Sequence, residues 1–441
     1  MRLTFFHAAL MLIVVSNNQS ARAQSPAPIS RAAAAAAATT TAATKPIAAP
    51  AALDPGNRTI RFLEERVRRD PEDITALNRL SGEYLRRFRR SGDDRDLTRA
   101  ADTAAQSLRA VPAEQNTAGL AARARAAFAL HGFATARDMA LQLVQLEPAK
   151  RYPFEILGDA LLELGDYDQA ADAYKKMESF GDPDVNTQTR LARLDLIKGD
   201  TAAARTKLDA AVEMARAMGP DAADVLAWCL VQAGQLAFGA GDWEIAEKDY
   251  QAALAARPSD WSAIDHLAEL RAAQKRYDDA LALYTALVAR VPRPELLQNL
   301  GDVYAIMGKS EDAKHWRDRA LEKYLAAATT GATHYDHHIA GFYSDSEPNP
   351  GEAVRWAKKD LAARHSIYAH DAMAWALYQA GEFKPAAEEM DKALALNTRD
   401  AHLLYHASLI YYRAGDAAKA KGSLRRAAEA NPKFTEFHVH R

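Results

Sequence analysis

The feature of this sequence that most constrains its fold is a pattern that returns with a period of about 34 residues. Near the end of the chain, Gly381 and Ala386 recur one period later as Gly415 and Ala420. Self-similarity at a fixed period is the signature of stacked structural units, each of which buries its apolar face only against its neighbours. The pattern therefore predicts a repeat array. Its clearest unit contains, in order, Leu157, Gly158, Leu161, Gly165, Tyr167, Ala170, Tyr174 and Pro183.

Each recurring residue type has a physical role in a pair of helices. Small residues such as Gly158 and Ala268 let two helices approach closely, aromatic residues such as Tyr174 fill the remaining space, and Gly165 ends the first helix. The chain is rich in Ala, has only 21 Gly and 18 Pro among 441 residues, and lacks the alternating β-branched residues that strands need. We therefore predict an all-α fold.

The pattern resembles the tetratricopeptide repeat (TPR), whose units are helix-turn-helix pairs. The resemblance covers residues 57–434. It implies a right-handed α-solenoid of about nine stacked repeats, with degenerate units at the N-terminal end. Two stretches, residues 86–97 and residues 344–351, are expected to form lengthened turns, and the arginines of the first are expected to be solvated.

The first residues predict export. Arg2, the apolar run Ala8–Val15 and the motif Ala21–Ala23 are typical of a signal peptide over residues 1–23. An uncleaved anchor is the alternative, but the run is shorter than the roughly 20 residues that span a bilayer. We expect a flexible Ala/Thr/Pro-rich linker over 24–56, a cap or tail over 435–441, no transmembrane segment in the mature chain, and a periplasmic or secreted protein.

Composition and motifs exclude several functions. With 56 basic and 58 acidic residues, the chain has no polyanion-binding footprint, so we expect no nucleic-acid partner. The single cysteine, Cys229, lies in an apolar stretch and is predicted to be a buried packing residue. Hydrolase, phosphate-loop and paired-cysteine motifs are absent from the sequence, so we predict that the protein is not an enzyme.

The resemblance also implies which residues bind a partner, because repeat positions 2, 5, 9 and 12 line the concave groove of TPR proteins. These positions predict an acidic central groove and an aromatic C-terminal part, which we expect to bind a protein or peptide. The acidic part comprises Tyr152, Glu155, Asp159, Asp265, Glu269, Glu295 and Asp302. The aromatic part comprises Tyr368, Trp375, Tyr378, Tyr405 and Tyr412.

Histidines suggest a second function. Nine of the 13 histidines lie after position 333, and His residues three apart share a helix face. A metal site for Zn or Cu, formed by His334, His337, Asp371 and His402, is therefore the alternative prediction. His402 also forms an i,i+4 pair with His406. The competing explanation is that these histidines are hydrogen-bonded residues with no ligand.

Overall fold

The computed structural model describes residues 55–329 and 333–434. The predicted signal peptide, the linker before residue 55 and the cap over 435–441 lie outside these residues. Residues 55–329 and 333–434 contain helices and no strand, so the all-α prediction is confirmed. The helices are α1 (Pro55–Arg69), α2 (Ile74–Ser91), α3 (Arg95–Ala110), α4 (Thr117–Ala129), α5 (Phe133–Leu146), α6 (Tyr152–Leu164), α7 (Tyr167–Glu178), α8 (Val185–Ile197), α9 (Thr201–Ala217), η1 (Pro220–Ala222), α10 (Ala223–Gly239), α11 (Trp243–Ala256), α12 (Trp261–Ala273), α13 (Tyr277–Val288), α14 (Pro294–Ile306), α15 (Ser310–Thr329), α16 (Asp336–Gly341), η2 (Phe342–Ser346), α17 (Pro350–Ala363), α18 (Ile367–Gln379), α19 (Phe383–Ala393), α20 (Ala401–Ala414) and α21 (Ala417–Ala430).

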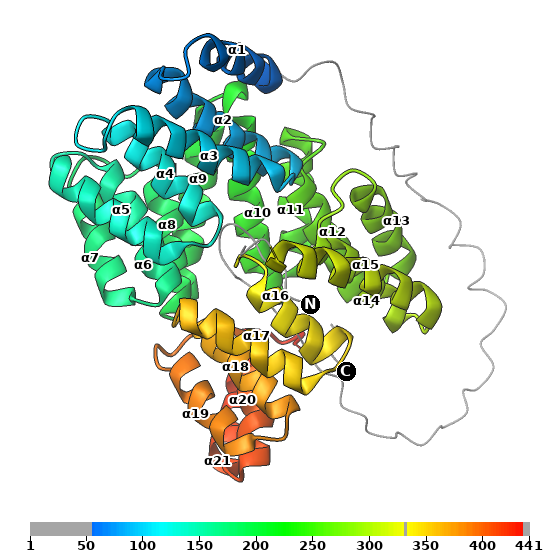
Figure 1. Cartoon of the computed structure of the whole chain (residues 1–441). Coiled ribbons are helices and arrows are strands. Elements are labelled where there is room, and N and C mark those ends of the chain that lie inside the picture. Colours follow the sequence, from blue (N-terminus) through cyan, green and yellow to red (C-terminus); the bar gives the residue numbers. More distant parts are fainter. Residues whose placement is uncertain (1–54, 330–332, 435–441) are drawn as a thin grey trace, which may run out of the picture.

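The helices from α2 to α21 form consecutive pairs that stack side by side into a solenoid (Figure 1). Within a pair, a small residue of the first helix faces an aromatic residue of the second. A Cβ atom added at Gly158 would overlap the ring of Tyr174, and one at Gly234 would overlap the ring of Tyr250. Both tyrosines are fully buried, which confirms the predicted role of these repeat positions.

The first helices of the pairs lie inside the solenoid and the second helices lie outside. Nearly all residues of α12 and α14 are buried, whereas α13 buries four residues and α15 buries three. We call these the inner and outer helices. Their different burial matches the layered arrangement in which each pair covers only its neighbours.

The solenoid winds back on itself, so that residues far apart in the sequence touch. The hydroxyl of Tyr167 accepts a hydrogen bond from the backbone N–H of Ile367 at 2.8 Å, across 200 residues of sequence. Leu164 accepts another from the backbone N–H of His365 at 2.8 Å. Six units of about 34 residues span about 204 residues, so one superhelical turn takes about six repeats. In Figure 1, α18 accordingly lies beside α6 and α8.

We call this contact between successive superhelical turns the seam. On one side it is formed by the short turns inside the early pairs, and on the other by the loops that precede the later inner helices. A Cβ atom at Gly165 would overlap the carbonyl of His365, and one at Gly199 would lie 2.5 Å from the carbonyl oxygen of Asn397. Close backbone contact of this kind requires glycine at the turn.

The prediction of two lengthened turns is wrong. Helix α2 continues to Ser91, so only three residues separate it from α3. Its arginines are not simply solvated: Arg90 donates to Asp224 at 2.7 Å, across the seam. In the second stretch, α16 continues as the π-helical turn Phe342–Ser346, and only residues 347–349 connect it to α17.

Helix α10 is the most apolar part of the solenoid. The stretch Pro220–Gly239 is long and apolar enough to cross a membrane by length and composition, although none was predicted, and 61% of it is buried. It packs between α9 and α11, as a core helix does. Cys229 within it is fully buried, as predicted, and burial raises the pKa of its thiol to about 12, so the thiol stays protonated.

Candidate functional site

The predicted acidic groove begins on α6, where arginines pair with its acids. Asp159 accepts two hydrogen bonds from Arg190, each at 2.8 Å. Glu155 lies 3.1 Å from the guanidinium of Arg151. Because each carboxylate is partly exposed beside an arginine, this part of the inner surface is charge-balanced and not acidic.

Tyr152 lies at the start of the same helix and is also partly buried. The guanidinium of Arg125 sits over its ring, 5.6 Å from the ring centre, and burial raises the pKa of its phenol to about 12. The ring is thus already in contact with a cation from the neighbouring repeat.

Glu295 and Asp302, on α14, are buried and each pairs with an arginine. Arg293 donates to the Glu295 carboxylate, and Arg317 lies 2.7 Å from the carboxylate of Asp302. Both acids are about 1% exposed. The prediction that they bind a partner in an open groove is therefore wrong. A buried carboxylate that already pairs with an arginine is not available to a partner.

Asp265 and Glu269 on α12 are buried without an arginine. Burial raises the pKa of each carboxyl to about 8, so both are mainly protonated at pH 7. Asn299 donates to Asp265 at 3.3 Å, and a ring nitrogen of His266 lies 3.1 Å from Glu269. The central groove is therefore not the negatively charged surface that the sequence predicted.

The aromatic residues predicted for the C-terminal part divide by exposure. Trp375 is buried and donates to Asp345 at 2.8 Å. Tyr405 is buried with its ring 5.9 Å from that of Phe434. These two side chains are core residues, which corrects their assignment to an open groove.

Two further aromatics lie near the C-terminal ends of consecutive inner helices. Tyr378 is partly exposed and stacks on Trp375, with ring centres 4.9 Å apart. Tyr412 occupies the same position in the next repeat and is 70% exposed. Among the large apolar side chains of the described residues, it is the most exposed.

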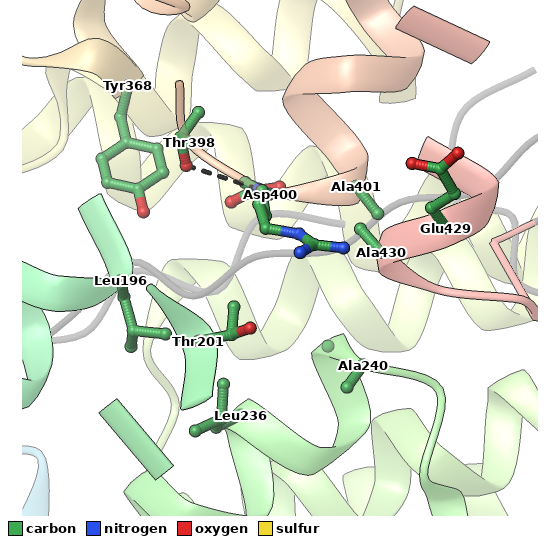
Figure 2. A pocket seen from close by; sticks show the side chains of 12 residues that line it. Leu196, Thr201, Leu236, Ala240, Tyr368, Thr398, Asp400, Ala401, Glu429 and Ala430 are labelled. Atoms are coloured by element: carbon green, nitrogen blue, oxygen red, sulfur yellow. Dashed lines mark hydrogen bonds between the residues drawn. The ribbon is translucent and has the colours of Figure 1, made fainter. Parts of the chain in front are cut away.

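Tyr368 lines a cavity of about 160 Å³ at the seam (Figure 2). Leu196 and Leu236 line it from one superhelical turn, and Tyr368, Thr398 and Asp400 line it from the other. Tyr368 therefore faces the space between two turns rather than an open concave surface.

The predicted metal set is divided between two places. His334 and His337 lie at the seam, each with its ring centre 6.1 Å from that of His131. Asp371 and His402 lie on α18 and α20. The four predicted ligands thus do not form one site, which corrects the prediction.

A different group of metal-binding residue types does converge. In the described part of the chain, Asp371, His402 and His406 alone form a group of three or more such residues, with one ligand atom from each lying within 4.8 Å of the others. The Nδ1 atom of His406 is 2.8 Å from Asp371, and Nε2 of His402 is 3.7 Å from it. His406 was not among the predicted ligands, although its i,i+4 spacing from His402 was the sequence signal that pointed to it.

Comparison with known proteins agrees with the repeat pattern. A family model described as tetratricopeptide repeat matches residues 121–184, 231–295 and 372–433. The first segment covers α4–α7, and the last covers α18–α21. No curated protein matches the sequence.

Several solved structures are similar to this one. Yeast Tom70 is 14% identical, with 84% of this chain and 88% of that chain covered and a TM-score of 0.36. A thermophilic TPR protein in Thermus thermophilus is 18% identical, with coverages of 47% and 99% and a TM-score of 0.36. The human IFIT1 dimer with PPP-AAAA is 12% identical, with coverages of 85% and 95% and a TM-score of 0.44.

Proposed function

Because this chain is an α-helical solenoid that carries tetratricopeptide repeats in three segments, we propose that it is a non-enzymatic scaffold that binds a protein partner. Solenoids of this kind present extended surfaces to their partners. The signal-peptide pattern of residues 1–23 supports a place in the bacterial envelope, either periplasmic or secreted.

The observation that carries the proposal is the exposure of Tyr412. A tyrosine offers a large, rigid contact area with a polar tip, and such side chains dominate the binding energy of protein interfaces. Tyr378 lies at the same position one repeat earlier, and Arg413 follows Tyr412 in the sequence. We place the partner on this C-terminal part of the inner surface, which we call the tyrosine rim, defined by Tyr378 and Tyr412.

The acids of the central groove are poor candidates for the same role. Asp265, Glu269 and Asp302 are at most 5% exposed, so a partner reaches them only if the solenoid opens. Reversing their charge would place a charge in the core and unfold the repeats. The tyrosine rim is a better target because Tyr412 is 70% exposed and its substitution leaves the core intact.

A pull-down from an envelope extract tests the proposal. We expect Tyr412→Ala to lose most of the captured partner, and Tyr378→Ala to lose part of it. Leu424→Ala is the matched control, because Leu424 is 44% exposed on outer helix α21 of the same pair, and it should retain the partner. Full retention by the Tyr378→Ala, Tyr412→Ala double variant would contradict the tyrosine rim as the interface.

Cell fractionation tests the location separately. We expect the chain in the periplasmic or extracellular fraction, with an N-terminus that begins after Ala23 by mass spectrometry. A chain that stays in the cytoplasm with residues 1–23 attached would refute export without affecting the partner site.

A further inference from the structure

We propose that Asp371, His402 and His406 form a binding site for one divalent first-row transition ion, with Zn²⁺ as the test ion. The site goes beyond the scaffold function and does not depend on it. Two imidazoles and one carboxylate are ligands that such ions accept. The three side chains come from neighbouring inner helices, so a bound ion would link the last two described helix pairs.

The repeat geometry brings the three residues together. Asp371 lies in the second turn of α18, and α18 contacts α20. His402 and His406 are four residues apart on α20, so their side chains share one face of that helix. Their rings are 3.9 Å apart, centre to centre, and both turn toward Asp371.

The distances are close to those of a tetrahedral site. With metal–ligand bonds of roughly 2.0–2.1 Å, ligand atoms lie about 3.3 Å apart. The Nδ1 atom of His406 lies 2.8 Å from one carboxylate oxygen of Asp371, and the Nε2 atom of His402 lies 3.7 Å from the other. One ligand atom from each residue lies within 4.8 Å of the others, so small side-chain rotations bring the three atoms to this spacing around an ion, and a fourth coordination position is left for water.

Neighbouring groups hold the ligands in place. The ring of His406 stacks on Trp375 at a centre distance of 3.9 Å and an angle of 6°, and Trp375 donates to Asp345 at 2.8 Å. The backbone N–H of His402 donates to the N-cap Asp400 at 2.9 Å, which fixes the first turn of α20. Such surrounding contacts orient the ligands of metal sites.

Burial and charge also favour an ion. Asp371, His402 and His406 are each at most 2% exposed. A buried carboxylate requires compensating positive charge or hydrogen bonds. A divalent ion supplies that charge to the whole group. The alternative is a metal-free, hydrogen-bonded His–Asp–His network, and the two differ in what they predict for added metal.

The test uses the purified full-length chain, freed of metal by a chelator and titrated with Zn²⁺ by calorimetry. We expect one tight site, and a rise in Tm on addition of Zn²⁺. His402→Gln and Asp371→Asn should weaken the binding more than about tenfold. The control is His266→Gln, because His266 is also buried beside a carboxyl on an inner helix but belongs to no such three-residue group among the described residues.

Spectroscopy decides the outcome if a variant fails to fold. The wild-type chain loaded with Co²⁺ should show the absorption of a four-coordinate ion, and X-ray absorption of the Zn²⁺ form should report two imidazole ligands. Absence of binding to the wild-type chain would overturn the proposal, as would unchanged binding in the folded His402→Gln and Asp371→Asn variants.

Discussion

At the scale of single residues, the inner surface shows how local surroundings decide what a side chain can do. Acidic residues at the predicted groove positions differ in burial and in ion pairing. Asp159 pairs with Arg190 and is partly exposed, whereas Asp265 is buried and its pKa is raised to about 8. A residue's place in the repeat fixes where its side chain points, but its neighbours fix its charge.

The small residue between paired helices gives the first prediction. Gly158→Ala should lower the free energy of unfolding by about 1–3 kcal/mol, because the new methyl group overlaps the buried ring of Tyr174. Gly82→Ala is the control. Gly82 is exposed within α2 with no atom within 4 Å of a new Cβ, so alanine there should stabilise by about 0.5–1 kcal/mol. Urea unfolding measures both, and equal effects would contradict the close packing.

The histidines of the seam predict acid sensitivity. Burial lowers the pKa of His334 to about 4 and also lowers the pKa values of His131 and His338. Arg293 lowers the pKa of His334 further, and Asp94 opposes this effect. An unfolded histidine binds a proton near pH 6.5, so between about pH 6.5 and about pH 4 the unfolded chain binds more protons. The contribution of these histidines to the free energy of unfolding should therefore fall as the pH falls through this window, whereas the raised pKa values of Asp265 and Glu269 act in the opposite direction.

Urea unfolding at about pH 7.5 and about pH 5 checks this expectation. His334 alone should contribute up to about 3 kcal/mol over the full window. His334→Phe keeps an aromatic ring but removes the proton, so it should make the stability less dependent on pH. The same change in the free energy of unfolding between the two pH values in the wild-type chain and in His334→Phe would contradict the prediction.

At the scale of elements, the helices begin and end where local side chains dictate. Asp200 and Asp242 both follow a glycine and precede an outer helix. Asp200 accepts a hydrogen bond from the backbone N–H of Ala203 at 2.9 Å, whereas Asp242 has no side-chain cap bond. The same local sequence thus gives one capped and one uncapped helix.

This pair gives a prediction at the element scale. Asp200→Ala should cost about 1 kcal/mol, because the first turn of α9 loses its cap. Asp242→Ala should cost less than about 0.5 kcal/mol. Hydrogen exchange of the first-turn amides in α9 and α11 measures both effects. If exchange accelerates equally in the two helices, side-chain capping does not explain the start of α9.

At the scale of the whole molecule, the seam joins successive superhelical turns, so that the array of repeats is no longer a simple linear stack. In the general description of repeat proteins, each repeat contacts only its neighbours. Here, repeats that are about six units apart in the sequence also contact each other. These contacts include hydrogen bonds, such as the one that the backbone N–H of Ile367 donates to the hydroxyl of Tyr167, and ion pairs, such as Arg293 with Asp94 at 3.1 Å. We therefore expect the two superhelical turns to unfold together.

Two glycines with the same backbone geometry test the seam. Gly165 and Gly415 both have φ 91° and ψ 7°, but only Gly165 lies against another turn of the superhelix. Gly415→Ala should cost about 1–2 kcal/mol from backbone strain alone. Gly165→Ala should cost about 1–3 kcal/mol more, because its methyl group overlaps the carbonyl of His365.

Small-angle X-ray scattering provides the second measurement for this pair. The radius of gyration should rise in Gly165→Ala and stay unchanged in Gly415→Ala. Equal unfolding costs and unchanged dimensions in both variants would show that the seam contributes nothing to the closed form in solution.

The helix pairs, the match between Gly158 and Tyr174, and the burial of Cys229 could all be predicted from the amino-acid pattern. These features depend on residues within one or two repeats, so the repeating pattern contains the information. Folding in three dimensions buries the acids of α12 and α14, brings His334 to His131, and places His406 rather than His334 beside Asp371. Contacts across the seam depend on small rotations accumulated over about six repeats, which no single unit of sequence specifies. The position of His406 depends on how α20 is turned against α18, which the side chains packed between the two helices determine.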